Sequence, residues 1–170
     1  MPDGPPLDPG ATKCPPIARP SAIPYDQIRA NIAQAHDIYD GVMTSNPEGA
    51  LPALFGFFIA QFAPGGAWDY KDLPQYRDGP EHDLARDFGN FNFGAILRSF
   101  GFSYYFTQNA AGAAQVGICA KTLLTGNGSG SCGVGVPGLV FPYQDQISDA
   151  VLIQNGYSYE KWIELHPCLM

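Results

Sequence analysis

The chain has 170 residues, 45% of them hydrophobic, which is the size of one ordinary domain with enough apolar side chains to bury a core. Sixteen acidic residues against nine lysines and arginines give a formal net charge of -7, and the basic residues form no run. These features disfavour a protein that grips nucleic acid through its phosphates. The apolar run 50–63 is too short and too interrupted to span a bilayer.

Residues 1–24 are rich in proline, which prevents helix formation and favours an extended arm or linker. The start of this arm lacks both the basic residues and the apolar core of a signal peptide. A protein that acts outside its cell would therefore leave by a signal-independent route or as part of a larger chain. We expect residues 25–170 to form one domain.

Helical periodicity appears first in residues 25–43, where apolar side chains recur every three to four positions. Residues 51–62 are apolar all round, which predicts a buried central helix. Asn46 can cap this helix, and the Pro64 turn should end it.

Residues 65–80 form a loop that is too long to be a mere connection, and loops of this length are often functional. It carries Trp68, Asp69, Tyr70 and Lys71, a mixture of aromatic rings and charges that suits a surface for stacking on sugar rings. The alternative is a lid held down by the Trp68 ring, with Asp69 paired to a neighbouring cation.

The stretch 87–94 alternates polar residues with phenylalanines, inside a helix expected to end at Gly101. In a helix, Asp87, Asn90 and Gly94 fall on one stripe, which places a carboxylate and a carboxamide beside a close-packed glycine. Carboxamides among phenylalanines are costly to bury unless their hydrogen bonds are met. The stretch is therefore either a structural polar network or a site for a ligand.

The densest acidic cluster of the chain, Glu81, Asp83 and Asp87, leads into this stretch. Neighbouring carboxylates of this kind suit a general acid. Acids at the start of a helix are also ordinary partners of the helix dipole, and for Glu81 and Asp83 we favour this second interpretation.

Beyond Ser103, a possible cap, a further helix is expected over residues 104–124. Its main polar interruption is Gln115, which could reach the amides of Asn90 and Asn92 or simply face solvent.

The C-terminal part is expected to hold two helices. A short one starts near Ile147 and carries the acid Asp149, and we expect Asn155–Gly156 to close it. A last helix covers residues 158–165.

Cys119 and Cys132 flank a flexible glycine-rich run, and Cys14 and Cys168 lie near the two ends of the chain. We expect these cysteines to form disulfides, with the pairing left open; the alternative is four reduced thiols. Their spacing fits neither a zinc site nor a redox pair. No familiar metal or nucleotide motif occurs elsewhere, so we expect no metal and no cofactor.

Several short motifs together resemble the polymorphic toxin type 44 domain, a module of bacterial toxins deployed against competitors. The matching positions are Trp68 to Lys71, Asp87 to Gly94, Gly101 to Ser103, Ala111 and Gly112 with Gln115, and Asp149, Ile153, Gly156 and Tyr159. The chain departs from the family pattern at Tyr70 and Asn92, where histidine is common, and this departure argues against a histidine base or a metal there.

The resemblance implies a mainly helical antibacterial effector with a cognate immunity protein and a secretion carrier or larger toxin chain. We favour a secreted hydrolase that degrades peptidoglycan in the periplasm of the target cell. Paired cysteines, an acidic surface and aromatic, carboxylate-bearing segments fit a neutral-to-basic glycan or peptide better than a polyphosphate.

In that mechanism, Asp87 or Glu81 is the general acid, and Asp69 or Asp149 stabilises charge or activates water. The side chains expected to hold the substrate are Trp68, Tyr70, Lys71, Asn90, Asn92 and Gln115.

Two alternatives from other classes stay open. The first is a nuclease toxin of the target cytoplasm, in which Asp69 and Lys71 do the acid–base work while Asn90 and Asn92 orient phosphate; its weakness is the missing basic surface. The second is a non-enzymatic binding or membrane-active module, supported only by the apolar helix over residues 51–62.

Overall fold

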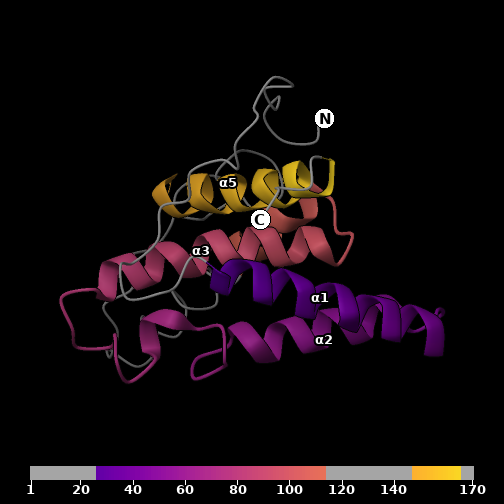
Figure 1. Cartoon of the computed structure of the whole chain (residues 1–170), viewed down its shortest axis with the longest axis horizontal. Coiled ribbons are helices and arrows are strands. Elements are labelled where there is room, and N and C mark those ends of the chain that lie inside the picture. The colour runs from indigo at the N-terminus through magenta and orange to yellow at the C-terminus, as the bar shows by residue number, and fades with distance from the viewer. Residues whose placement is uncertain (1–25, 114–146, 166–170) are drawn as a thin grey trace.

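The structure is a computed structural model that describes residues 26–113 and 147–165. Within these residues the fold is mainly helical and contains no strand, which confirms the fold class predicted from the sequence (Figure 1). The arm expected over residues 1–24, the four cysteines and Gln115 lie outside this part of the chain. No helix among the described residues is long and apolar enough to cross a membrane.

The described residues form α1 (Asp26–Ser45), α2 (Ala50–Phe62), the short 3-10 helix η1 (Tyr70–Asp72), α3 (His82–Ser99) and α5 (Ile147–Leu165). Residues 104–113 are helical as well.

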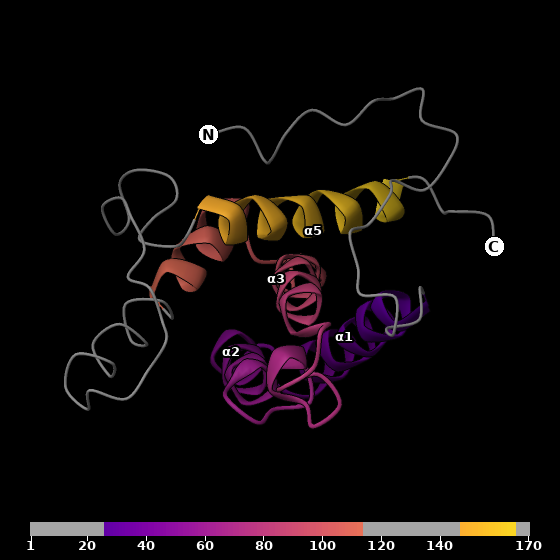
Figure 2. The ribbon, with the colours of Figure 1, turned by 90° about the vertical axis from the view of Figure 1, so that its left-hand side faces the viewer.

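α3 lies at the centre of the described bundle. Figure 2 looks along α3 and shows α5 crossing above it, with α1 and α2 below. α3 contacts α5, α1 and η1, while α2 packs against α1. Phe88, Ile96 and Leu97 of α3 are fully buried, because this helix carries apolar side chains on more than one face. Its polar residues are therefore placed against several different neighbours.

α3 and α5 cross at two glycines. A Cβ atom at Gly94 would lie 1.9 Å from the carbonyl oxygen of Ile153, and one at Gly156 would lie 1.8 Å from the carbonyl oxygen of Phe91. The two backbones thus touch, and no larger residue fits. The prediction that Asn155–Gly156 closes a helix is wrong, because α5 continues through this pair without a break. The glycine serves the crossing and not a helix end.

α2 is not the buried central helix that its composition predicted. Leu54 and Phe58 are buried, but Leu51 at the start of the helix is 62% exposed, and Ile59 is also exposed. α2 lies at the edge of the bundle in both views, so only one of its faces is covered (Figure 1, Figure 2).

The turn residues end and begin helices largely as predicted. Gly101 follows α3 with a φ of +75°, the left-handed conformation typical of a glycine at a helix C-terminus. Ser103 caps the next helix, since its Oγ accepts a hydrogen bond from the Phe106 N–H at 3.2 Å. Asn46 does not cap α2; its Oδ1 accepts from the Gly49 N–H at 3.1 Å and closes the preceding turn.

The loop 65–80 is held against the core. Trp68, Tyr70 and Tyr76 are all buried, and η1 within this loop contacts α3. These contacts agree with the interpretation of a segment held down by its aromatic rings.

Candidate functional site

The stripe predicted for the stretch 87–94 lies on one helix, and its Gly94 end faces α5. Asp87, Asn90 and Gly94 all belong to α3, and Gly94 lies against the backbone of α5. Asp149 stands in the first turn of α5 and is 8% exposed. The fold thus brings two of the predicted catalytic carboxylates, Asp87 and Asp149, to the same end of the α3–α5 pair.

Arg86 lies beside these carboxylates. Its Nη2 donates a hydrogen bond to Asp87 Oδ1 at 3.1 Å, and its Nη1 donates to Asp83 Oδ1 at 3.4 Å. Burial lowers the pKa of Arg86, but the hydrogen bond with Asp87 and the charges of Asp149, Asp87 and Asp83 outweigh it, so the pKa is raised. Arg86 therefore stays charged beside all three acids.

Arg86 was not among the residues proposed from the sequence. The available signal was its spacing, directly before Asp87 and three residues after Asp83 on one helix. No local pattern could indicate that Asp149 acts on Arg86, because the two residues lie far apart in the sequence.

Two hydrogen-bond donors in this cluster have no acceptor. Arg86 Nε and Asn90 Nδ2 are both buried, and neither makes a hydrogen bond. Buried polar atoms in folded proteins are nearly always paired, so two unpaired donors beside partly exposed carboxylates make this cluster a candidate site. We define the α3–α5 cluster as Arg86, Asp87, Asn90 and Asp149. It can offer carboxylates to a reacting group and N–H donors to an oxygen of a ligand.

Asn92 belongs to a different network from Asn90. It is 0% exposed, and its Oδ1 accepts from Asn31 Nδ2 of α1 at 2.9 Å. The same Asn31 Nδ2 donates to the Tyr70 hydroxyl at 2.6 Å, while Gln27 Nε2 donates to Asn31 Oδ1 at 2.9 Å. Burial is the main reason why the pKa of Tyr70 rises to about 12. Asn92 and Tyr70 thus join α1, η1 and α3 deep inside the protein.

Trp68 and Asp69 also have structural surroundings. The rings of Phe57 and Phe62 pack against Trp68 at centroid distances of 5.9 and 5.4 Å, so the indole offers no open face to a sugar in this conformation. Asp69 Oδ2 accepts from the Gly65 N–H at 3.1 Å. Burial and then the hydrogen bond with Asp72 raise the pKa of Asp69.

The remaining predicted residues of this region lie around the same loop. The charge of Lys71 acts on Asp69 and opposes the rise of its pKa. Glu81 directly precedes α3 and makes no capping hydrogen bond with its side chain. The structure therefore gathers Asp87, Asn90 and Asp149 at one place and leaves Asp69, Lys71 and Glu81 on the loop side of the molecule.

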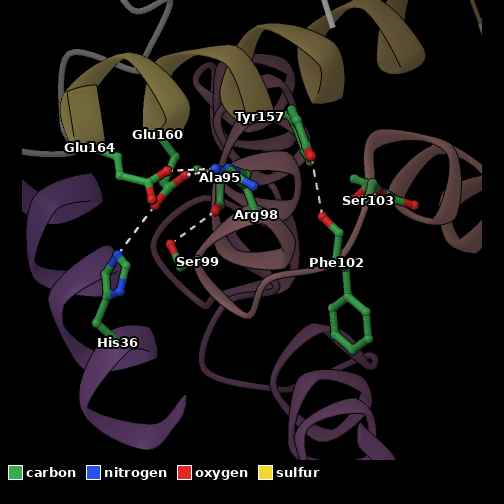
Figure 3. A network of polar contacts seen from close by, with 10 residues as sticks. His36, Ala95, Arg98, Ser99, Phe102, Ser103, Tyr157, Glu160 and Glu164 are labelled. Carbon is green, nitrogen blue, oxygen red and sulfur yellow. Dashed lines mark hydrogen bonds and ion pairs between the residues drawn. The ribbon is translucent and has the colours of Figure 1, made fainter. Parts of the chain in front are cut away.

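A third polar network joins three helices and was not predicted (Figure 3). Glu160 of α5 is buried, and its Oε1 lies 3.2 Å from Nε2 of His36 on α1. Its Oε2 lies 3.3 Å from Arg98 Nε of α3, an ion pair whose geometry is not that of a hydrogen bond. Arg98 also binds Glu164 and lies over the Tyr157 ring, 5.7 Å from its centroid.

Burial is the largest influence on Glu160 and raises its pKa, against the lowering effect of Arg98 and His36. Because Glu160 is enclosed by its own partners and the crossing helices, we assign this network to the architecture and not to the candidate site.

Within residues 26–113 and 147–165, no three acidic, histidine or cysteine side chains are grouped so as to hold a metal ion.

Comparison with protein-family models, with curated proteins and with solved structures finds no match for the chain in any of the three.

Proposed function

We propose that the protein is a secreted antibacterial effector that hydrolyses peptidoglycan, with the α3–α5 cluster as its active site. The observation that carries this proposal is that the charges of Asp87 and Asp149, from two crossing helices, both act on Arg86, next to the unpaired donor of Asn90. Most enzymes that cleave glycans use a pair of carboxylates for catalysis, and side-chain amides can bind the substrate beside them.

The two carboxylates differ in their surroundings, which suggests different roles. The Asp87 side chain is 32% exposed, so it can exchange protons with a substrate at the surface. Asp149 is more deeply buried and accepts a hydrogen bond from Ser148 Oγ at 3.3 Å, so its orientation is restrained. We assign acid–base work to Asp87 and the activation of water or stabilisation of positive charge to Asp149.

The charge of the cluster favours a cell-wall substrate over a nucleic acid. Asp83, Asp87 and Asp149 surround Arg86. Three carboxylates against one guanidinium repel a polyphosphate, and the whole chain carries a net charge of -7. A glycan or peptide meets no such repulsion.

The resemblance to type 44 toxin domains supports the biological setting of this proposal. An effector that acts in the periplasm of a target bacterium needs a carrier for delivery and an immunity protein in the producing cell. Both partners follow from the proposed activity.

Expression of the chain in a bacterium, with and without an export signal, tests this proposal. We expect cell rounding and lysis only with the exported form, and loss of lysis in Asp87→Asn and Asp149→Asn. Asp83→Asn is the matched control, since Asp83 also pairs with Arg86 but its side chain is 78% exposed.

Growth arrest by the unexported form, without lysis of the exported one, would refute the cell-wall activity and favour a cytoplasmic nuclease. Lysis that persists in both Asp87→Asn and Asp149→Asn would remove the α3–α5 cluster from the mechanism.

A further inference from the structure

The unpaired donors of the α3–α5 cluster lie on consecutive turns of one helix. Arg86 and Asn90 are four residues apart on α3, so their side chains are neighbours. One N–H of each Nη atom of Arg86 already binds Asp83 or Asp87, and Nε–H is a donor of Arg86 that is buried and unused. Nδ2 of Asn90 is the second unused donor. A ligand that satisfies both must supply an acceptor oxygen.

The charge around these donors restricts that oxygen to a neutral group. A carboxylate or phosphate group would be repelled by Asp83, Asp87 and Asp149, because their combined negative charge exceeds the positive charge of Arg86. A carbonyl oxygen is neutral and has two lone pairs, so it can accept from both donors.

The same cluster also offers acceptors to a ligand. The Asp87 carboxylate is partly exposed beside the two donors. A secondary amide presents one carbonyl oxygen and one N–H, and it therefore matches donors and acceptor together. From this match we infer that Arg86 and Asn90 bind the carbonyl oxygen of a secondary amide in the substrate, either the acetamido group of an amino sugar or a peptide bond. The inference rests on the proposed function and specifies which feature of the wall the site recognises.

Access to the donors requires a small movement. Both nitrogen atoms are covered in the free protein, but the Arg86 side chain is 40% exposed and long enough to turn. The gain is the pairing of two buried donors, each of which costs free energy while it is unpaired. Arg86 and Asn90 thereby act as specificity-determining residues beside the carboxylates.

Side-chain NMR on the full-length, isotope-labelled protein can test this inference with three soluble probes. These are the N-acetylglucosamine trimer, an N-acetylated alanine tripeptide amide, and the glucose trimer, which has no amide. We expect the signals of Arg86 Nε–H and Asn90 Nδ2–H to shift with one or both amide probes and not with the glucose trimer. The amide probe that binds more tightly identifies the source of the amide.

Two variants separate recognition from folding. Arg86→Lys keeps a positive charge near Asp87 but lacks the Nε–H, and Asn90→Leu removes the amide; each should weaken binding of the amide probe about tenfold, as expected for one lost hydrogen bond. Asn109→Leu is the matched control, because Asn109 bonds only to the carbonyl of its own helix at Tyr105 in the described contacts. Unfolding midpoints confirm that each variant is folded.

The inference is overturned if the glucose trimer binds as well as the amide probes, if no amide probe binds at millimolar concentration, or if both variants bind like the unaltered protein. Failure of the proposed function has a different signature. In that case exported protein would not lyse cells even though amide probes bind, whereas lysis without any amide binding would contradict only this inference.

Discussion

Glu160 shows how one buried charge makes stability depend on pH. Its side chain is 3% exposed, and burial raises its pKa above the ordinary value of 4.5. A carboxyl group with a raised pKa binds its proton more tightly in the folded chain than in the unfolded chain. Its contribution to the free energy of unfolding is therefore complete at pH values below 4.5 and is lost as the pH rises through the higher folded pKa.

Replacing this carboxylate with an amide should remove that loss. We expect the urea midpoint of Glu160→Gln, relative to the unaltered protein, to increase as the pH is raised from about 4 to about 7.5, spanning the range in which a buried carboxyl titrates. Glu164→Gln is the control, because Glu164 also pairs with Arg98 but is half exposed. If the difference in urea midpoint between Glu160→Gln and the unaltered protein did not vary with pH, the raised pKa of Glu160 would be contradicted.

Removing the buried amide of Asn31 or Asn92 should lower the free energy of unfolding, because it leaves the buried partner groups unpaired. Asn31→Leu removes the hydrogen bonds to both Asn92 Oδ1 and the Tyr70 hydroxyl. We expect a loss of about 1–3 kcal/mol in the free energy of unfolding for each orphaned group. The double variant Asn31→Leu/Asn92→Leu should be less destabilised than the sum of the two single variants, since it orphans fewer groups. Simple additivity in urea unfolding would show that the two amides do not interact.

The crossing of α3 and α5 is the central feature at the scale of helices. The helices touch through Gly94 and Gly156, and this contact sets the positions of the polar clusters on either side of it. The α3–α5 cluster lies toward the N-terminal ends of both helices, and Arg98 with Glu160 lies toward their C-terminal ends. The two helices therefore run in the same general direction.

Alanine substitutions measure this contact directly. Gly94→Ala and Gly156→Ala push a methyl group into backbone carbonyls, and each should destabilise the protein by at least about 1–3 kcal/mol. Gly89→Ala is the matched control on the same helix, since a Cβ atom there meets nothing within 4 Å. It should raise stability by up to about 1 kcal/mol through helix propensity. Equal effects at Gly89 and Gly94 in urea unfolding would disprove the close crossing.

The sequence predicted helices more reliably than their surroundings. Periodicity located α1, α2 and α3, and it placed Asp87, Asn90 and Gly94 on one stripe because these positions are related by local helix geometry. It misjudged Gly156, since a glycine required by tertiary contact has the same local appearance as one that ends a helix. α2 was misjudged for a related reason: an apolar composition does not say how many neighbours a helix has.

The candidate site could be predicted only in part, again for a physical reason. Asp87, Asn90 and Asp149 stood out as polar residues in apolar surroundings. Arg86 was overlooked, and so was the link from His36 to Glu160, which spans 124 positions. Contacts between residues so far apart depend on how helices pack, and no local pattern records them.

At the scale of the whole molecule, the protein is acidic and mainly helical, and we propose that its carboxylate site acts on the cell wall. Leu51 and Ile59 of α2 are exposed, and the proposed site does not use them. The net charge of -7 and the acidic α3–α5 cluster both point away from a polyphosphate substrate.

Digestion of purified peptidoglycan by the purified full chain tests the central claim most directly. Soluble fragments would be identified by mass spectrometry, in which a new reducing end marks glycosidic cleavage and a new amino group marks amide cleavage. We predict fragment release by the unaltered protein and by Asp83→Asn, and none by Asp87→Asn or Asp149→Asn when both variants are folded. No release by the folded, unaltered protein, or equal release by all four proteins, would contradict the account.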